Sequence, residues 1–443
     1  MKKTPIVLGC LLLLLSVITG CGSRHQEKIS GDFTYEIVDG TAIITKYNNL
    51  STTETLVIPD TLDGHPVSVI DGFGKAQNLK EVILPNTVQI IDSYAFNGCA
   101  NLQVVHLNEG ILQIASCAFK DCVSLKEFSF PTSLERINSE AFKGCSSLIS
   151  ITGGSGLQTI EKDAFFGTSW QDAQPNVLSY GGLIFGYKDS DAFDEILELP
   201  PDTRRIMPQT FQFVDSVKHI ILPDSIEYLG ASSFYSMKDL EHVVFGGGNR
   251  LRTIEANVFA DCSALTSVDL SSVTLIGEDM FWGCKNLSSV RADAVTTVGA
   301  SAFSGCRALT QYRFPAVTRI EDFGFSGTGI TELNLPEGIQ LGESVFQDCS
   351  ALTSATIPVD VSYGCFSGCT SLANVTLADG CAEVGPKAFH TRQPMTVHVS
   401  DTVTRIASNA FGDIGKKSIN FIGTSEYAKI YAYNHKFYLT EDN

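Results

Sequence analysis

The chain has 443 residues, of which 44% are hydrophobic and 18% are charged, so it can bury a large core and is not intrinsically disordered. It carries 31 Lys and Arg against 49 Asp and Glu, and this net charge of −18 argues against a nucleic-acid partner and against a polybasic membrane-surface protein. Thirteen cysteines are too few for a disulfide scaffold.

The first twenty residues have the pattern of an export signal. Two lysines precede an apolar run at residues 6–18, which is too short for a transmembrane helix. The run ends in Ile18-Thr19-Gly20-Cys21, which resembles the lipobox of bacterial lipoproteins. The resemblance implies cleavage after Gly20 and a lipid on Cys21; an ordinary secretory signal with a chance cysteine is the alternative. We therefore predict a lipoprotein signal peptide over 1–20 and a polar tether over 21–32.

Residues 33–60 are predicted to form an N-terminal cap. Alternating apolar and polar residues flank Asp39-Gly40, a dipeptide that is typical of tight β-hairpin turns. We expect this hairpin to precede the repetitive part of the chain.

A repeat organises residues 61–424. Its marker is a Phe, often preceded by Ala, that recurs at nearly regular intervals apart from one interval of double length. The mean interval of about 22.5 residues lies in the range of leucine-rich repeats. The marker stands at Phe73, Phe96, Phe119, Phe142, Phe165, Phe211, Phe234, Phe259, Phe281, Phe303, Phe325, Phe346, Phe366, Phe389 and Phe411.

Each repeat is predicted to be one coil of a solenoid. An aliphatic residue stands five positions before the Phe in 14 of 15 repeats, and Gly or Asp often follows two positions after it. A Leu and a short alternating run come next, and Pro often ends that run. We expect a short strand, an irregular aliphatic segment and an Ala-Phe turn in each coil. Stacked coils would bury one core, with parallel strands about 4.8 Å apart and the Phe rings as an internal spine.

Eight cysteines recur three positions after the marker. They are Cys99, Cys122, Cys145, Cys262, Cys284, Cys306, Cys349 and Cys369. Other repeats hold Thr168, Val214, Met237 or Thr328 at this position, so it does not require a disulfide. We interpret the cysteines as a ladder of small buried side chains in preference to a disulfide framework, and we predict no metal or cofactor.

The interval from Phe165 to Phe211 is twice the usual length, so one repeat near residue 188 has lost its marker. The aromatic-rich segment 166–201 is either a variant coil whose aromatics fill the core or a protrusion that binds a ligand. The spacing favours the variant coil.

Residues 425–443 are predicted to form a C-terminal cap. Ser425 can cap a short helix with Ala428, Ile430 and Tyr431 on its apolar side. A last strand near Leu439 would follow.

The layout of the repeat resembles one known family. Residues 137–148 (INSEAFKGCSSL) fit the BspA-type leucine-rich repeat of bacterial surface proteins at every marked position. The resemblance extends over about residues 33–443. It implies an α/β-type repeat solenoid, mostly strand with irregular or short helical turns and with a parallel sheet along one face. A fold does not fix a ligand.

The strand-lined face is the predicted binding surface because an extended, mildly polar sheet suits a protein that lies along several repeats. Its candidate residues are His219, His242, Thr266, Ser267, Ser288, Thr310, Gln311, Thr331, Glu332 and Thr353. The two histidines occupy the same position in consecutive repeats, so we expect them to stack on adjacent strands as exposed sheet residues. A metal site would require a third ligand, and no such residue recurs with the two histidines.

Known nucleophile, zinc and phosphate-loop motifs are missing from the sequence, and we predict that the protein is not an enzyme. The leading hypothesis is a surface lipoprotein outside the cytoplasm that binds extracellular or surface proteins in adhesion. It would touch the membrane only through its lipid. One alternative is a carbohydrate-binding accessory of a surface polysaccharide system, with exposed aromatics around Trp170, Trp282 or Tyr312. Another is a passive envelope scaffold.

Overall fold

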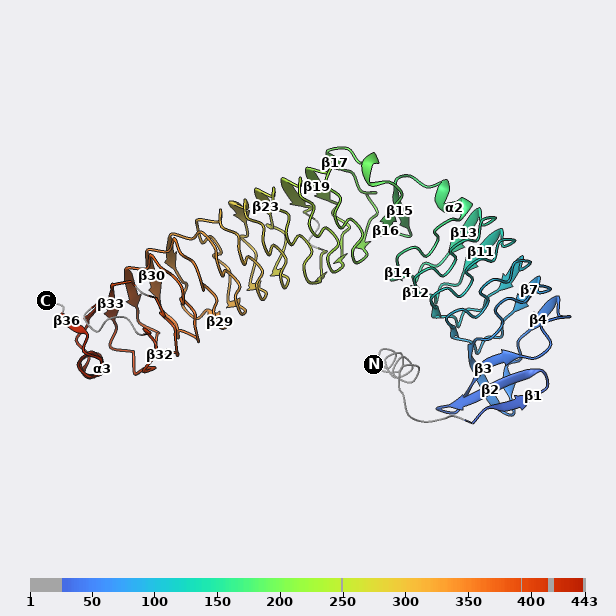
Figure 1. The fold of residues 1–443 in the computed structure, drawn as a ribbon, viewed down its shortest axis with the longest axis horizontal. Coiled ribbons are helices and arrows are strands. Elements are labelled where there is room, and N and C mark those ends of the chain that lie inside the picture. Colours follow the sequence, from blue (N-terminus) through green and yellow to red (C-terminus); the bar gives the residue numbers. More distant parts are fainter. Residues whose placement is uncertain (1–25, 248–249, 392, 413–417, 441–443) are drawn as a thin grey trace, which may run out of the picture. The chain divides into compact units, whose positions relative to one another are not determined.

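The computed structural model describes residues 26–247, 250–391, 393–412 and 418–440, which form a leucine-rich repeat β-solenoid of about 16 coils with little helix (Figure 1). This confirms the predicted fold class. The chain divides into two compact units, Met1–Ala173 and Gln174–Asn443. The predicted signal peptide and Cys21 lie outside the described residues. Within the described residues, no helix is long and apolar enough to cross a membrane.

The first unit opens with three antiparallel strands. Strands β2 (Phe33–Val38) and β3 (Thr41–Tyr47) form the expected hairpin, and both turn residues, Asp39 and Gly40, have positive φ. Strand β1 (Lys28–Ser30) pairs with β2, so the prediction of a tether over 21–32 is wrong for these residues. The polar sequence of β1 gives no strand signal, but its pairing covers an edge of β2 that would otherwise be open.

Two parallel ladders follow the hairpin in the first unit. The irregular aliphatic segment of each coil is in fact a second ladder of mostly two-residue strands. One ladder holds β4 (Thr55–Val57), β7 (Glu81–Ile83) and β9 (Val104–His106), and then the separate pair β11 (Glu127–Phe130) and β13 (Ser150–Gly153). The other holds β6 (His65–Ile70), β8 (Ile90–Ile91), β10 (Gln113–Ile114), β12 (Arg136–Ile137) and β14 (Thr159–Ile160), while β5 (Thr61–Leu62) pairs with β6 from the side.

The segment 166–201 is a variant coil with buried aromatics. It contains helix α2 (Ser169–Asp172), the antiparallel hairpin β15 (Val177–Tyr180) and β16 (Leu183–Tyr187), and the 3₁₀ turn η1 (Ser190–Ala192). Trp170 and Phe185 are buried. The ring of Tyr187 stacks on Phe211 with centroids 6.3 Å apart, so a tyrosine takes the place of the missing marker.

The second unit also has two ladders. The strand-lined face holds β17 (Ile196–Leu197), β19 (His219–Leu222), β21 (His242–Phe245), β23 (Ser267–Asp269) and β25 (Ser289–Arg291), and after a break β28 (Glu332–Asn334), β30 (Ser354–Ile357), β31 (Asn374–Leu377), β33 (Met395–Val399), β35 (Ile419–Ile422) and β36 (Tyr438–Thr440). The opposite ladder holds β18 (Arg205–Ile206), β20 (Tyr228–Leu229) and β22 (Thr253–Ile254), then after a break β24 (Leu275–Ile276), β26 (Thr297–Val298), β27 (Arg319–Ile320) and β29 (Gln340–Leu341), and after a second break β32 (Glu383–Val384) and β34 (Arg405–Ile406).

The marker rings form the core of each unit, as predicted. All fifteen marker Phe side chains are buried. Neighbouring rings stack with centroids 5.3 Å apart from Phe73 to Phe165, and 5.0 to 5.8 Å apart from Phe211 to Phe411. The spine holds successive coils at a fixed spacing, and the strand-lined face inherits that regularity.

The second unit ends in helix α3 (Glu426–His435) and strand β36. The Ser425 hydroxyl accepts a hydrogen bond from the backbone N–H of Ala428, and Lys436 ends the helix with a φ of 60°. Ala428, Tyr431 and Ala432 are buried. The assignment of Ile430 to the apolar side is wrong: its side chain is 51% exposed, because it lies two positions from Ala428 and so on the far side of the helix.

Candidate functional site: the strand-lined face of the second unit

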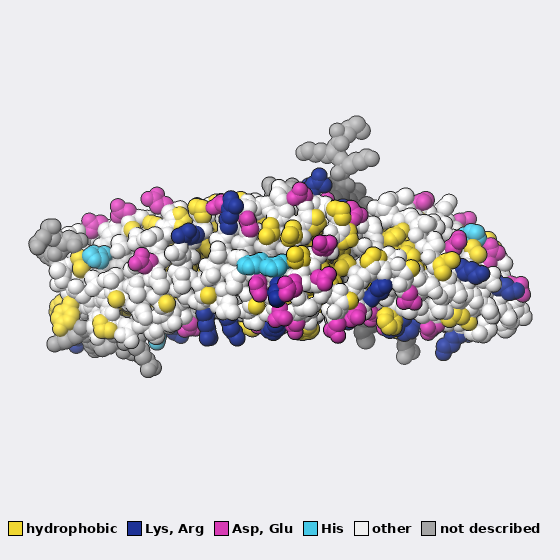
Figure 2. Space-filling model, turned by 90° about the horizontal axis from the view of Figure 1, so that it is seen from above, with side chains coloured by type: hydrophobic (Ala, Val, Ile, Leu, Met, Phe, Trp, Pro, Cys, Tyr) yellow, Lys and Arg dark blue, Asp and Glu magenta, His cyan; other side chains and the backbone are white. Residues whose placement is uncertain are grey.

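The candidate residues lie on the strand-lined face of the second unit because side chains alternate along each strand. Ile220, Val243 and Val268 point inward and are buried. Their neighbours in sequence point outward, and the register places His219 beside His242 and His242 beside Ser267. Figure 2 shows hydrophobic, histidine, acidic and basic side chains intermingled in the middle of the visible face.

The two histidines stack as predicted. Their rings are 5.2 Å apart between centroids and nearly parallel, with an angle of 6°. Nδ1 of His242 lies 2.6 Å from the Ser267 hydroxyl, and both histidines are half-buried, so they are less exposed than expected. Among the described side chains, no group of three or more His, Cys, Asp or Glu could hold a metal ion. The pair is therefore a flat, partly polar contact surface.

Several predicted contact residues are hydrogen-bonded within the solenoid. The hydroxyls of Thr266, Ser288 and Thr353 donate to the backbone carbonyls of Glu241, Thr266 and Thr331, at 3.1, 3.3 and 2.9 Å. Each bond joins one coil to the preceding one. The proton of each hydroxyl is engaged in a hydrogen bond to the backbone, so these side chains stiffen the face. Only their oxygen lone pairs remain available to accept a hydrogen bond from a partner.

The remaining candidates lie farther along the same face. Thr310, Gln311, Thr331 and Glu332 are exposed, and Gln311 and Glu332 are joined by an isolated parallel β-bridge. The structure therefore places all ten candidates on one side of the second unit, but it does not gather them into a single cluster.

Three exposed aliphatic side chains beside the histidines were not predicted. They are Ile196, Ile221 and Val244, with exposed fractions of 49%, 57% and 43%, and we call them the apolar patch. Ile196 is the register partner of His219, and Ile221 is the register partner of Val244. The signal was present in the strand sequences HIIL and HVVF, which have no polar residue at the outward middle position. The expectation of a mildly polar face is therefore wrong at these strands.

Charged residues border the apolar patch. Nζ of Lys218 lies 2.5 Å from Oε1 of Glu195, and Arg291 lies 3.6 Å from Asp269. The hydrogen bond between Lys218 and Glu195 lowers the pKa of Glu195 and raises the pKa of Lys218. Such exposed pairs contribute little to stability, but they set the orientation of an approaching partner.

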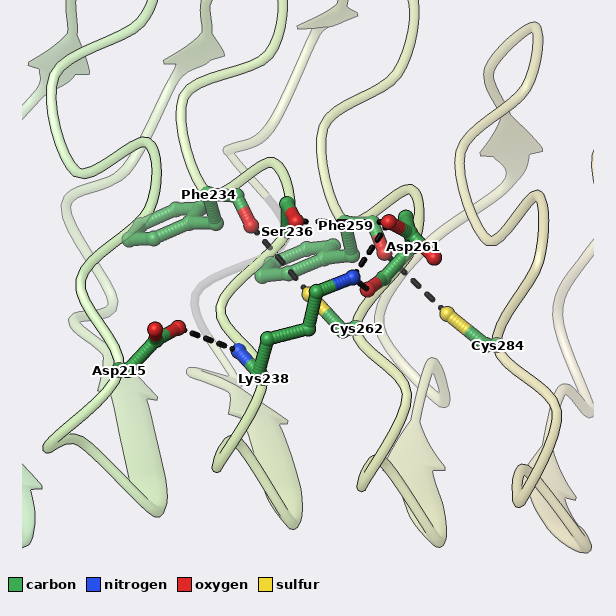
Figure 3. A network of polar contacts seen from close by, with 8 residues as sticks. All are labelled: Asp215, Phe234, Ser236, Lys238, Phe259, Asp261, Cys262 and Cys284. Carbon is green, nitrogen blue, oxygen red and sulfur yellow. Dashed lines mark hydrogen bonds and ion pairs between the residues drawn. The ribbon is translucent and has the colours of Figure 1, made fainter.

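The recurring cysteines are buried parts of the core. All eleven described cysteines are buried and free of disulfides. Figure 3 shows the arrangement: the thiols of Cys262 and Cys284 donate to the backbone carbonyls of Phe234 and Phe259 in the preceding coils, at 3.3 and 3.2 Å. Burial raises the pKa of Cys262 to about 12, so it stays protonated and is not a nucleophile.

The polar groups around these thiols are also structural. In Figure 3 the backbone N–H of Lys238 donates to Asp215 at 2.9 Å, while its ammonium group pairs with Asp261. The Ser236 hydroxyl donates to the same carboxylate at 3.4 Å. The network joins neighbouring coils and leaves no acid or base next to an activated nucleophile among the residues drawn.

The aromatic side chains suggested for carbohydrate binding do not gather on the surface. Trp170 is buried, and Tyr312 packs against Phe314 and Phe325 with its hydroxyl buried and without a hydrogen-bond partner among the described residues. Trp282 is 44% exposed. Of the three aromatics named for the carbohydrate alternative, Trp282 alone is exposed, so Trp170 and Tyr312 give that alternative no support.

A hollow lies on the opposite ladder and was not predicted. It has a volume of about 1060 Å³ and is lined by residues of the stretches 337–341, 358–362 and 379–386 together with Arg405 and Ala407; we call it the groove. The signal that could have revealed it is the marker step from Phe346 to Phe366, the shortest in the chain.

Comparisons with known proteins agree with the repeat pattern. The family model described as BspA type leucine rich repeat region matches residues 71–177, 187–310, 292–396 and 342–441. No curated protein matches the chain.

Similar solved structures include three bacterial proteins. A leucine-rich repeat protein from Bacteroides ovatus is 20% identical over 94% of this chain and 100% of that chain, with a TM-score of 0.31. A leucine rich cell surface protein from Faecalibacterium prausnitzii is 20% identical over 80% of this chain and 95% of that chain, with a TM-score of 0.29. The pneumococcal vaccine antigen PcpA is 14% identical over 95% of this chain and 100% of that chain, with a TM-score of 0.30.

Proposed function

The chain belongs to the BspA-type leucine-rich repeat family, and from this premise we propose that it is a surface protein that binds other proteins through the strand-lined face of its second unit. Leucine-rich repeats are typically a non-catalytic scaffold that stacks coils into an extended binding surface. The observation that carries the proposal is the apolar patch. Ile196, Ile221 and Val244 expose about half of their side chains on an otherwise regular sheet.

Exposed aliphatic side chains grouped beside aromatic-like rings are typical of protein interfaces. A partner that covers the apolar patch gains the transfer free energy of these side chains. It can also lay a flat apolar group on the stacked rings of His219 and His242. The ion pairs Lys218–Glu195 and Arg291–Asp269 form a polar rim around this centre. The partner class is therefore a folded or extended protein with its own apolar contact residues.

We further propose that the protein is lipid-anchored through Cys21 and lies outside the cytoplasm. The support is the order of positive charge, short apolar run and lipobox-like Ile18-Thr19-Gly20-Cys21. A surface position would present the strand-lined face to matrix proteins or to proteins of neighbouring cells, which makes adhesion the expected role.

The proposal is tested with the unlipidated chain of residues 22–443 against immobilised matrix proteins, mucins and glycans, at low and high salt. The double variant Ile221→Thr/Val244→Thr keeps the β-branched shape favoured in strands while it removes apolar contact area. We expect a saturable protein ligand that survives high salt, and a loss of affinity of about tenfold or more in the variant.

The matched control is Leu275→Thr, which changes a similarly exposed aliphatic residue on the opposite ladder of the same unit. It should bind like the unchanged protein. Binding only to glycans would contradict the proposal in favour of the carbohydrate accessory, and no binding across the panel would contradict it in favour of the passive scaffold.

A further inference from the structure

The ladder opposite the strand-lined face is interrupted twice, once between β22 and β24 and once at the groove. At the coil before the interruption, the backbone N–H of Gln340 donates to Thr318 and that of Gly342 donates to Ile320, both at 2.8 Å. The equivalent residues of the next coil are Asp360 and Ser362. Over this stretch, all of which is described, neither of their N–H groups forms a backbone hydrogen bond with the preceding coil.

The ladder resumes at the coil after the interruption. The backbone N–H of Gly385 donates to Val361 at 2.7 Å, and Val361 and Val384 form a parallel bridge. Between residues 360–362 and the described strand of the preceding coil, only a side chain spans the gap. The Ser362 hydroxyl donates to the carbonyl of Gly342.

The interruption at the groove coincides with a short coil, whereas the one between β22 and β24 does not. Phe346 and Phe366 are closer in sequence than any other two consecutive markers, whereas the following step to Phe389 has the usual length. Their rings still stack at 5.5 Å, and on the strand-lined face β30 still pairs with both β28 and β31. Because the spine and that face keep their register, this coil has fewer residues between β30 and Val361 than the next coil has between β31 and Val384.

The interruption leaves backbone hydrogen-bonding groups open to the groove. The carbonyls of Ile339 and Leu341 and the N–H groups of Asp360 and Ser362 have no backbone partner among the described residues. Such groups are free to accept a partner in place of water, and the extended backbone of a second polypeptide offers donors and acceptors in alternation. Below them Ile339, Val359 and Val361 are buried and close the floor of the groove.

The negative charge of the groove lining favours a positively charged partner. Glu337, Asp360, Asp379 and Glu383 line the groove, against the single lining cation Arg405, which is paired with Glu383. Asp360 accepts hydrogen bonds from the backbone N–H groups of Ala382 and Glu383. Because these donors are uncharged, the carboxylate keeps its negative charge. The net charge of −18 of the chain adds a long-range attraction for cations.

We propose that the groove binds an extended, basic segment of another polypeptide, whose backbone pairs with the free groups of Leu341 and Ser362 and whose Lys or Arg side chains meet Glu337 and Asp379. This site lies on the ladder opposite the apolar patch and does not depend on the function proposed above.

The test uses the whole protein and fluorescence anisotropy of the labelled peptide (Lys-Thr)₄ at low salt. Two further probes are its N-methylated form, which lacks alternate backbone donors, and spermine as a competitor. We expect saturable binding of (Lys-Thr)₄, at least tenfold weaker binding of the N-methylated peptide, and poor competition by spermine. The variant Glu337→Lys should weaken binding about tenfold, since it reverses one charge of the lining.

The control Glu332→Lys makes the same charge change on the strand-lined face and should leave peptide binding nearly unchanged. Ile221→Thr/Val244→Thr should also bind the peptide normally, so failure of the proposed function and failure of the groove can be told apart. Absence of binding would overturn the inference. So would equal binding of the N-methylated peptide, efficient competition by spermine, or equal losses in Glu337→Lys and Glu332→Lys, because each of these indicates nonspecific attraction of cations.

Discussion

The carbonyl oxygen of Phe281 accepts two hydrogen bonds, one from the backbone N–H of Cys284 and one from the thiol of Cys306, each at 3.2 Å. The thiol bond is therefore the second bond of an oxygen that is already satisfied. Met237 occupies the same position of the repeat, and there the carbonyl of Phe211 keeps the hydrogen bond from the backbone N–H of Val214 at 3.3 Å. The Phe ring has no such substitute, because it fills the space between two neighbouring rings.

A pair of substitutions separates these two roles. Cys306→Val should lower the free energy of unfolding by no more than about 1 kcal/mol, since one redundant hydrogen bond is lost. Phe303→Ala should lower it by about 3–5 kcal/mol, because the ring is buried and stacks on Phe281 and Phe325 at 5.5 and 5.2 Å. Urea unfolding of both variants measures the difference. Equal losses would show that the thiol, and not only the ring, holds the coils together.

A second residue-scale prediction concerns pH. Glu140 accepts hydrogen bonds from the ammonium groups of Lys120 and Lys143, at 2.7 and 2.9 Å, and these bonds lower its pKa from 4.5 to about 2. A carboxylate whose pKa is lower in the folded than in the unfolded state stabilises the folded protein at pH values above the unfolded-state pKa of that carboxylate. That stabilisation is lost as the pH falls from about 4.5 through about 2.

Glu140→Gln should therefore be less stable than the unchanged protein at pH 7, and the difference should shrink at pH 3. Urea midpoints at the two pH values provide the measurement. Glu127→Gln, an exposed acidic residue of β11, serves as the control and should show little effect at either pH. A difference for Glu140→Gln that is the same at both pH values would rule out the ion-pair origin.

At the scale of elements, the C-terminal cap offers a direct test of helix capping. Ser425→Ala removes the hydroxyl that accepts from Ala428 and should cost about 1 kcal/mol. Lys436→Gly should act in the opposite direction, because φ is 60° at this position and glycine adopts that conformation without strain. Thermal unfolding of both variants gives the sign of each effect. Destabilisation by Lys436→Gly would mean that its side chain has a contact that outweighs the backbone strain.

The elements that repeat could be predicted from the sequence, and those that do not repeat mostly could not. The Phe spine and the strand after each Leu were predictable because the same residue spacing recurs along the chain. A coil whose own sequence is ambiguous can therefore be assigned from the other coils. Strand β1 was missed because its Lys28–Ser30 pairing is decided by the open edge of β2 and not by its own residues. The opposite ladder was missed because a two-residue strand is too short to show alternation.

The face on which the candidate residues lie could be predicted from the sequence, whereas its hydrogen bonds between coils could not. Alternation put His219 and His242 on one face correctly, since the period of a strand is fixed by its backbone. Alternation cannot show that a hydroxyl such as that of Thr266 is used by the preceding coil. It also cannot show that the opposite ladder is interrupted at the groove, because both facts depend on contacts between coils.

At the scale of the whole molecule, the predicted lipid anchor has its own test. In a bacterial host with lipoprotein processing, the expressed protein should partition into the detergent phase, and its N-terminal peptide should carry an acylated Cys21. Cys21→Ser should move the protein to the aqueous phase without changing its folded structure, because the described solenoid begins after this residue. An unmodified Cys21 on a soluble mature chain would support an ordinary secretory signal instead.

The central claim is that the strand-lined face of the second unit is the protein-binding surface. Hydrogen–deuterium exchange of the protein with and without the protein ligand found in the binding panel tests it most directly. We predict slower exchange in β17, β19, β21 and β23 on binding, with little change in β24, β26 and β27 on the opposite ladder. Protection confined to the opposite ladder or to the first unit, with none on β19 and β21, would contradict the claim.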